Sequence, residues 1–379
     1  MNKYQLKNKY FYKFNLISKK LFLFLKNLIN YFLFQLLRVL FYRKSKRTNH
    51  NRILFINTEK FGDLILSFDF LYSFQKEKSF EERFLLINEN YSELFELTSL
   101  SYSVITYKKK KYKYDLFYRA SLLKKLSSYN FDTVINISPE RGSLNDELTI
   151  LTQSNNKIGL KSLSPFYVSI FNNVYKNYYS LFINSESINE YEILKSCLKY
   201  YNLDVKEYYD EKWERKIQNK IVIAPSASEP KRNWRPENFR RLLEQLSKSY
   251  FVILVGTSKQ KKLLQDLAEG LSNAKIEVNK SYHELFDLIS SAILFVGLES
   301  GLTHLALQLR RPLVSIIGGG KHGIFFPYKE SSRTYFAAHK MDCFKCFWNC
   351  KYKNPYCIDK VSYDEILNAC NERLSEYSQ

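Results

Sequence analysis

Three polar side chains late in the sequence have the chemistry to bind a hydroxylated, charged ligand. They are Glu299, Ser300 and His304. An apolar run from Ala292 to Val296 predicts a buried strand, Gly297 to Gly301 a tight turn, and Leu302 to Leu309 a helix. A strand, a glycine turn and a helix in this order can place a phosphate at the helix N-terminus. The competing interpretation is an ordinary connection, since most such turns contain glycine and bind nothing.

An acidic residue near the start of the chain is the second candidate. Ile53 to Ile56 predicts a short buried strand, Asn57 to Gly62 a polar turn, and Asp63 opens an apolar helix through Leu71. The helix dipole favours an ionised carboxylate in a first turn, so Asp63 could accept a proton as a general base. The alternative role is a helix cap, for which aspartate is well suited.

Serine and basic side chains follow another predicted strand, Lys220 to Ala224. Lys231 and Arg232 place two positive charges in the loop that follows this strand. Ser226 and Ser228 could bond phosphate oxygens, and a helix-capping loop is the equal alternative for either serine.

The elements that must position these residues alternate between strand and helix. Further strands are predicted at Phe84 to Ile87, Thr133 to Ile137, Phe251 to Val255 and Pro312 to Ile317, and helices at Ser92 to Leu97, Leu116 to Leu126, Ile188 to Tyr201, Pro236 to Ser247 and Lys259 to Leu271. This alternation predicts parallel sheets covered on both faces, in two α/β domains at residues 51–210 and 211–379. The 379 residues, 45% of them hydrophobic, suffice for two cores. The loops after Ile56, Ala224, Val255, Val296 and Ile317 are expected to face one cleft.

Two polar stretches interrupt this pattern. Residues from Asn156 to Lys216 are Tyr-rich and resist segmentation outside the predicted helix. The run from Lys108 to Lys113 predicts a solvated loop, with contact to acceptor phosphates as the sharper alternative.

Residues 1–50 hold twelve Lys or Arg and no Asp or Glu, which is +12 of the formal net charge of +20. Between Leu21 and Leu40, apolar residues recur at steps of three and four. These are Leu21, Phe22, Leu25, Leu28, Ile29, Phe32, Leu33, Leu36, Val39 and Leu40, opposite Lys19, Lys20, Lys26, Asn27, Asn30 and Arg38. The longest uncharged stretch, Asn27 to Leu37, is too short to span a bilayer.

This pattern predicts a basic amphipathic helix that binds an anionic membrane surface through residues 15–45. The alternative is an ordinary packed helix. Arg43 to His50 is expected to be a polar linker. Nucleic acid is a poorer match, because the basic surplus lies on an amphipathic helix and not across the folded body. Without a small-residue cleavage site, we expect no signal peptide and a cytoplasmic location.

Four cysteines are spaced as Cys343-x2-Cys346-x3-Cys350-x6-Cys357. In a reducing compartment four thiolates can hold a structural zinc, with no catalytic role. The alternative is a packed or partly oxidised cluster, since the second spacing departs from a zinc ribbon.

Three ordered motifs together resemble glycosyltransferase family 9, the bacterial heptosyltransferases, over about residues 52–360. They are Ile53 to Asp63, Ala224 to Phe239, and Val296 to His304. The resemblance implies a GT-B fold, with the acceptor on the N-terminal half and a nucleotide-sugar donor on the C-terminal half. It implies inverting transfer without a catalytic metal or other cofactor. It also implies that Asp63 is the catalytic base.

The resemblance further implies a set of donor-binding residues. They are Ser226, Ser228, Lys231, Arg232, Glu299, Ser300, Gly301, Leu302 and His304. Arg232 stands where the family commonly has lysine, which leaves open whether it or Lys231 contacts the diphosphate. Glu299 replaces the usual aspartate. Gly318 to Gly323 replaces the usual Gly-Pro. Its glycines allow close backbone approach, and a flexible turn is the preferred interpretation.

By this resemblance the protein moves heptose from ADP-heptose to a lipopolysaccharide-core or other lipid-linked acceptor. The inner face of the cytoplasmic membrane is the expected location. Two alternatives are transfer of another sugar in surface-glycan assembly, and a nucleotide-sugar-binding protein of the same fold without turnover.

Overall fold

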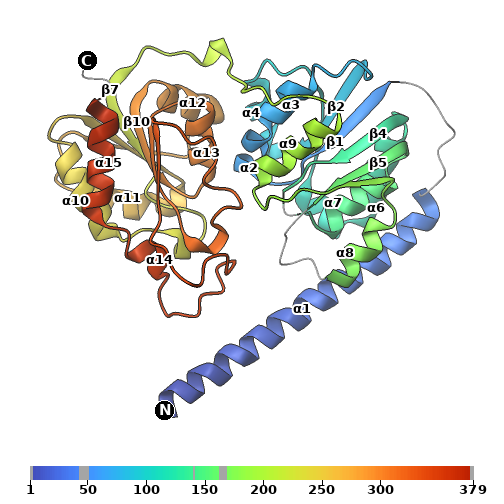
Figure 1. The fold of residues 1–379 in the computed structure, drawn as a ribbon, viewed down its shortest axis with the longest axis horizontal. Helices are drawn as coiled ribbons and strands as arrows, with labels where there is room; N and C mark the ends of the chain where they lie inside the picture. Colours follow the sequence, from blue (N-terminus) through green and yellow to red (C-terminus); the bar gives the residue numbers. More distant parts are fainter. Residues whose placement is uncertain (1–2, 42–50, 140, 162–168, 376–379) are drawn as a thin grey trace.

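The computed structural model describes residues 3–41, 51–139, 141–161 and 169–375, which form two α/β halves side by side (Figure 1). Within these residues each half contains a six-stranded sheet, and every pairing is parallel. The orders are β3-β2-β1-β4-β5-β6 and β12-β11-β10-β7-β8-β9. When the second sheet is followed from β9, its order repeats that of the first, so both halves are doubly wound. The predicted α/β architecture is confirmed.

The strands of the first sheet are β1 (Arg52–Ile56), β2 (Glu82–Asn88), β3 (Ser103–Tyr107), β4 (Phe131–Asn136), β5 (Ser154–Leu160) and β6 (Leu181–Ile183). Those of the second are β7 (Gln218–Ile223), β8 (Phe251–Gly256), β9 (Ala274–Val278), β10 (Ala292–Leu298), β11 (Leu313–Ile316) and β12 (Thr334–Ala337). Most inner strands are largely apolar, because helices cover both faces of each sheet.

Helices α2 (Phe61–Leu66), α3 (Phe68–Phe74), α4 (Ser92–Glu96) and α9 (Glu190–Tyr200) cover the face of the first sheet that is turned to the second half. Helices α1 (Lys3–Phe41), α5 (Lys109–Tyr114), α6 (Leu116–Ser127), α7 (Ser143–Leu151) and α8 (Ser169–Lys176) contribute to its outer face. In the second half, the helices on the side of the sheet turned to the first half are α12 (Tyr282–Ser290) and α13 (Gly301–Gln308). Those on its outer side are α10 (Pro236–Leu246), α11 (Lys261–Ala268), α14 (Tyr356–Asp359) and α15 (Tyr363–Ser375).

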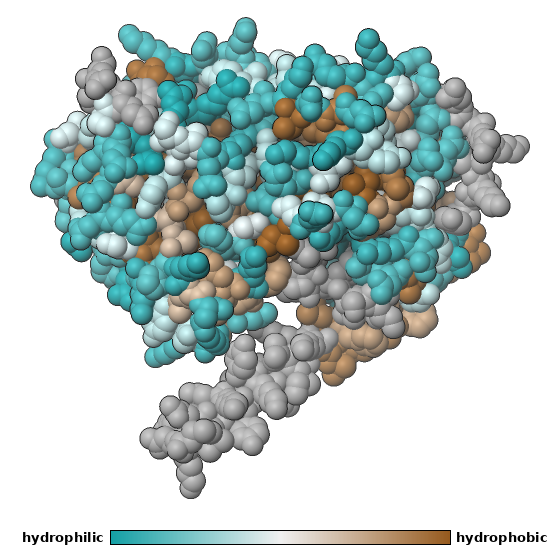
Figure 2. All heavy atoms as spheres, in the orientation of Figure 1, coloured by the Kyte–Doolittle hydropathy of each residue, from teal (hydrophilic) through white to brown (hydrophobic). Residues whose placement is uncertain are grey.

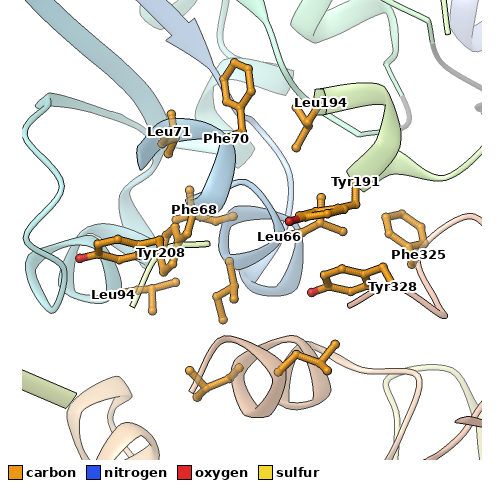
Figure 3. Packing of buried hydrophobic residues seen from close by; sticks show 14 of the residues in the cluster. Leu66, Phe68, Phe70, Leu71, Leu94, Tyr191, Leu194, Tyr208, Phe325 and Tyr328 are labelled. Atoms are coloured by element: carbon orange, nitrogen blue, oxygen red, sulfur yellow. The ribbon is translucent and has the colours of Figure 1, made fainter. Parts of the chain in front are cut away.

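Three apolar clusters follow from this layering. Side chains alternate along a strand, so Ile53 and Phe55 of β1 enter one cluster and Leu54 and Ile56 enter another. The cluster that contains Phe55 continues into the second half and is called the central cluster here. Figure 3 shows part of it where α2 and α3 meet α13. The site between the halves is therefore built on a shared core.

Three local predictions were wrong. The helix expected from Asp63 to Leu71 is two helices separated at Ser67, whose hydroxyl donates to the Leu64 carbonyl at 2.7 Å. The Lys108 to Lys113 run is not a loop but mostly α5, because lysine is a good helix former and Tyr112 is buried. Part of the predicted glycine turn belongs to β10, since Gly297 and its neighbour pair with β11.

The N-terminal helix is longer than predicted. Within it, Leu21–Phe41 is long and apolar enough to cross a membrane, by length and composition alone. The short uncharged stretch from Asn27 to Leu37 therefore does not by itself exclude a span. The linker predicted at Arg43 to His50 lies outside the described residues.

Candidate functional site

An open pocket of about 890 Å³ lies between the two halves. The loops that follow β1, β7, β8, β10 and β11 all contribute to its lining, as expected for the carboxyl ends of parallel strands. Most of the residues proposed from sequence for catalysis and donor binding line this one pocket. They are Asp63, Ser226, Ser228, Arg232, Glu299, Ser300, Gly301, Leu302 and His304.

Asp63 is the third residue of α2, on the wall formed by the first half. Its Oδ2 accepts a hydrogen bond from the Lys60 backbone amide at 3.0 Å, so it does cap the helix. The capping and catalytic interpretations are compatible, because the same carboxylate also lines the pocket. The helix start favours its ionised form, which is the form that can accept a proton.

Two glycines let the starts of α2 and α13, which both line the pocket, come into direct contact. A Cβ on Gly62 would lie 2.7 Å from Cδ2 of His304, and one on Gly301 would lie 2.5 Å from Cδ1 of Phe61. Neither position can carry a side chain without moving a neighbour. The glycine at the start of α13 is thus required by contact between the halves, a reason that the sequence pattern did not reveal.

Glu299 and Ser300 occupy the connection between β10 and α13. Glu299 is buried, and the Ser300 hydroxyl lies 3.5 Å from that of Thr303. Both side chains line the pocket beside the helix start. A carboxylate and a hydroxyl there can bond sugar hydroxyls, while the backbone amides of the first turn can bond phosphate.

His304 is a neutral, buried side chain. Burial, and to a smaller extent the nearby Lys329, lowers its pKa to about 3. Its Nδ1 lies 2.8 Å from the Tyr328 hydroxyl, and its ring lies 4.2 Å from that of Phe326. As a neutral imidazole it can exchange hydrogen bonds in the pocket, but it brings no positive charge to a diphosphate.

The depressed pKa of His304 predicts acid destabilisation. The pKa falls from 6.5 to about 3 on folding, so the unfolded state binds a proton that the folded state rejects. The melting temperature should therefore fall as the pH drops from 6.5 towards 3, with no contribution from this group above that range. Across this pH range the melting temperature of His304→Gln should fall less steeply than that of the unsubstituted protein. His283→Gln, which removes an exposed histidine, should leave the slope unchanged.

The structure places the two basic residues that follow β7 in different environments. Arg232 ends a short 3₁₀ turn, lines the pocket, and places its guanidinium carbon 5.7 Å from the Trp348 ring centre. Lys231 is exposed, and its Nζ donates to the Trp348 carbonyl at 3.0 Å. Arg232 is thus the better placed cation for a diphosphate in the pocket.

This difference predicts unequal effects for two adjacent substitutions. Arg232→Ala should weaken nucleoside diphosphate binding by roughly tenfold or more, since hydrogen bonds to charged groups contribute about 1.5–3 kcal/mol. Lys231→Ala should leave that affinity nearly unchanged. Titration calorimetry with ADP and UDP measures both. Equal losses would show that Lys231 also reaches the diphosphate.

Several other pocket residues were not proposed from the sequence. Lys321 is buried in the turn after β11, where the sequence suggested a flexible turn or a close backbone approach but no binding residue. Phe61 and Tyr282 stack across the pocket, with ring centres 5.1 Å apart. Thr257 and Lys259 follow β8. The sequence signal that could have identified these two residues is a small hydroxyl residue and a lysine directly after a buried strand.

A buried polar network joins the halves behind the pocket. Asp69 of α3 accepts from the Tyr191 hydroxyl at 2.6 Å and from the Tyr208 amide at 2.9 Å. Lys329, which follows β11, places its Nζ 2.7 Å from the same carboxylate and 3.2 Å from Oε1 of Gln308 in α13. Figure 3 shows Tyr191 and Tyr328 facing each other beside α13. Sequence patterns carried no sign of this pairing.

The glycine run after β11 is not a flexible turn. Gly319–Lys321 forms a 3₁₀ turn, and added Cβ atoms on Gly318 or Gly320 would meet the Trp348 ring. The run lets the cysteine-rich segment pack closely. Because Trp348 also lies against Arg232, that segment supports the pocket from outside.

The four clustered cysteines line one small cavity beside Gly319. All are free thiols, and burial raises the pKa of Cys350 and Cys357. Across the described part of the chain, no three His, Cys, Asp or Glu side chains are arranged as ligands of one metal ion. Structural zinc at Cys343, Cys346, Cys350 and Cys357 therefore stays a prediction, which metal analysis of the purified protein can test.

Two doubly wound halves around a ligand-sized pocket define a protein of the GT-B class. Solved structures share this fold. E. coli heptosyltransferase WaaC with ADP-2-deoxy-2-fluoro heptose superimposes with a TM-score of 0.64 at 16% identity, covering 86% of this chain and 99% of that one. A glycosyltransferase family 9 structure from Veillonella parvula gives 0.70 at 15% identity, covering 88% and 99%.

Sequence comparison shows the family. The profile of glycosyltransferase family 9 (heptosyltransferase) matches residues 119–355, and the chain belongs to this family. Lipopolysaccharide heptosyltransferase 3 of E. coli is 26% identical over 126 residues, which cover 32% of this chain and 37% of that protein. Its counterpart from strain K12 is 23% identical over 170 residues, covering 41% and 46%. The matches thus span less than half of these curated relatives.

Proposed function

We propose that the protein transfers a sugar from a nucleotide-sugar donor to a lipid-linked saccharide acceptor in lipopolysaccharide-core assembly. The family indicates heptose from ADP-heptose as the donor. One observation carries the proposal: a carboxylate on α2 and the start of α13 line the same pocket and are held together by Gly62 and Gly301.

The arrangement suits a single displacement with inversion. Asp63 takes the proton of the acceptor hydroxyl as the acceptor oxygen bonds to the anomeric carbon of the sugar. The bond from that carbon to the diphosphate oxygen breaks on the opposite face. Arg232 and the amides at the start of α13 stabilise the negative charge on the departing diphosphate. Protein groups supply each of these roles, so the proposed reaction uses no catalytic metal.

The place of action is part of the same proposal. A lipid-linked acceptor is held at a membrane, so we place the enzyme on the inner face of the cytoplasmic membrane, attached through residues 15–45. The basic surplus of +12 in residues 1–50 favours an anionic partner, and its place on an amphipathic helix favours a lipid surface over nucleic acid.

A donor screen tests the proposal. ADP-, UDP-, GDP- and CDP-sugars are added to the full chain and the melting temperature is recorded, because a bound ligand stabilises the folded state. We expect the largest rise with an ADP-sugar, followed by release of ADP when a lipid-linked core acceptor is added. A response confined to another nucleotide would favour a different surface glycan. Donor binding without turnover would favour the non-catalytic alternative.

A further inference from the structure

One side of α1 is attached to the first half. Asn27, Asn30, Phe34 and Leu37 are buried there. Nδ2 of Asn30 donates to the Ser143 hydroxyl of α7 at 3.1 Å, and the Phe34 ring lies 4.8 Å from that of Tyr175 in α8. The two asparagines that the sequence placed on the polar side of the helix are therefore buried against the protein.

The opposite side of α1 is an exposed apolar stripe. Its members are Leu21, Phe22, Leu25, Ile29, Phe32, Leu36, Val39 and Leu40. At about 1.5 Å per residue the stripe is roughly 30 Å long. In Figure 2 it contributes to the hydrophobic surface beside the lower edge of the first half. An uncovered apolar surface of this length marks a docking face.

Packing along this segment decides between lying on a membrane and spanning it. Phe24, near one end of the stripe, lies 5.8 Å from the ring of Phe171 in α8. Near the other end, the guanidinium carbon of Arg38 lies 5.5 Å from the ring centre of Tyr178. A helix held by the folded half over this whole length cannot cross the bilayer without taking α7 and α8 with it. It can lie in the interface with its apolar side down.

A second exposed apolar group lies next to α1, at the junction of α5 and α6. Phe117 is 90% exposed and Tyr114 is 75% exposed, beside a partly exposed Leu116. Lys113 of α5 lowers the pKa of the Tyr114 hydroxyl, and Lys26 of α1 and a second lysine of α5 add smaller effects. Lysines of both helices therefore surround this corner. Aromatic and leucine side chains among lysines are the composition of membrane-interface segments.

Charge selects a bilayer over a second copy of the chain. Phe22, Leu25, Ile29, Phe32, Leu36 and Val39 follow the three-and-four spacing of a coiled coil. A symmetric pair would bring together two segments of +12 each, with no acidic residue in 1–50 to form interhelical ion pairs. Anionic lipid offers the opposite charge together with an apolar phase.

We propose that the stripe of α1 and the Tyr114–Phe117 corner form a single docking face for an anionic lipid bilayer. The face is tied to the pocket, because Nζ of Lys109 in α5 donates to the Thr58 carbonyl at 2.9 Å in the loop that leads to Asp63. Docking thus holds the acceptor wall of the pocket near the lipid surface. The membrane attachment of α1 and this last consequence rest on the proposed function, whereas the docking role of the Tyr114–Phe117 corner goes beyond it.

Vesicle co-sedimentation of the full chain tests the proposal, with phosphatidylcholine vesicles and with vesicles of equal parts phosphatidylcholine and phosphatidylglycerol. We expect binding to the anionic vesicles that weakens with added salt. Phe32→Ser in the stripe and Phe117→Ser in the corner should each weaken it by about tenfold or more. Tyr200→Ser, an exposed aromatic on α9, is the matched control and should bind normally.

Several results would overturn the docking face. Normal binding by Phe117→Ser would show that the Tyr114–Phe117 corner is not part of the docking face. Equal binding to neutral vesicles would show that the face does not select anionic lipid. Resistance to carbonate extraction would show a spanning helix. A dimer in solution that Phe32→Ser dissociates would make a second copy the occupant. The donor-induced rise in melting temperature should be the same in these variants, so failure of the proposed function would appear there and not in sedimentation.

Discussion

Asp63→Asn is expected to lower the turnover number for sugar transfer by about 10²–10⁴-fold, the usual contribution of a positioned general base. Asparagine has nearly the same shape, and its side-chain oxygen can still accept the hydrogen bond from the Lys60 amide that the carboxylate accepts at 3.0 Å. The substitution thus removes the proton acceptor and keeps the cap. Donor affinity should be unchanged, because the donor phosphates are assigned to the opposite wall.

A matched substitution separates catalysis from capping. Asp115 accepts from the Tyr118 amide at 3.0 Å at the start of α6, which is the same local chemistry outside the pocket lining. Because Asp115 lies within the docking corner, Asp115→Asn is assayed with a detergent-solubilised acceptor, on which it should keep full activity. Initial rates of nucleotide release at saturating donor, together with donor binding measured by thermal shift, give both quantities. Full turnover in Asp63→Asn would show that another group accepts the proton.

Lys329→Met is expected to lower the free energy of unfolding by about 3–5 kcal/mol, the usual cost of leaving one partner of a buried ion pair uncompensated. The Asp69 side chain is 1% exposed and that of Lys329 is 12% exposed, so water cannot replace the lost cation. Urea unfolding followed by circular dichroism measures the change. Since the pair joins the two halves, donor binding between them should also weaken.

The double variant Asp69→Asn/Lys329→Met should recover part of the loss. Asparagine has no charge to leave uncompensated and can still accept from the Tyr208 amide. Lys262→Met removes one side of an exposed pair with Asp266 and should have no measurable effect. If Lys329→Met behaved like Lys262→Met, the Asp69 carboxylate would have to be hydrated in solution.

The sequence predicted every inner strand of the two sheets except β5 and missed the edge strands β3, β6, β9 and β12. Strands covered on both faces, such as β1 and β10, are continuous apolar runs and are recognisable without any partner. By contrast β9 (Ala274–Val278) alternates small, charged and apolar residues, and β5 (Ser154–Leu160) begins with polar ones. Pairing with a neighbour makes these segments strands, and a single sequence does not show which neighbour is available.

The candidate site likewise contains some residues that were predictable from the sequence and others that were not. Asp63 and the Glu299 to His304 turn were predictable, because each follows a buried strand and opens a helix. The interaction between Asp69 and Lys329 was not, because 260 positions separate the partners and neither lies in a motif. The neutral state of His304 was equally hidden, since it depends on burial by residues from other loops.

The central cluster also determines how the protein can be divided. Trp213, just past the boundary predicted between residues 210 and 211, donates from its indole to the Leu97 carbonyl at 2.7 Å and packs against Phe286 of the other half. A fragment ending at that boundary would lose this tryptophan and uncover the apolar side of α2 and α3. We therefore expect neither fragment to be soluble when expressed alone, and the intact chain to melt in a single transition. For crystallisation or labelling the natural unit is the whole two-sheet body, not either half.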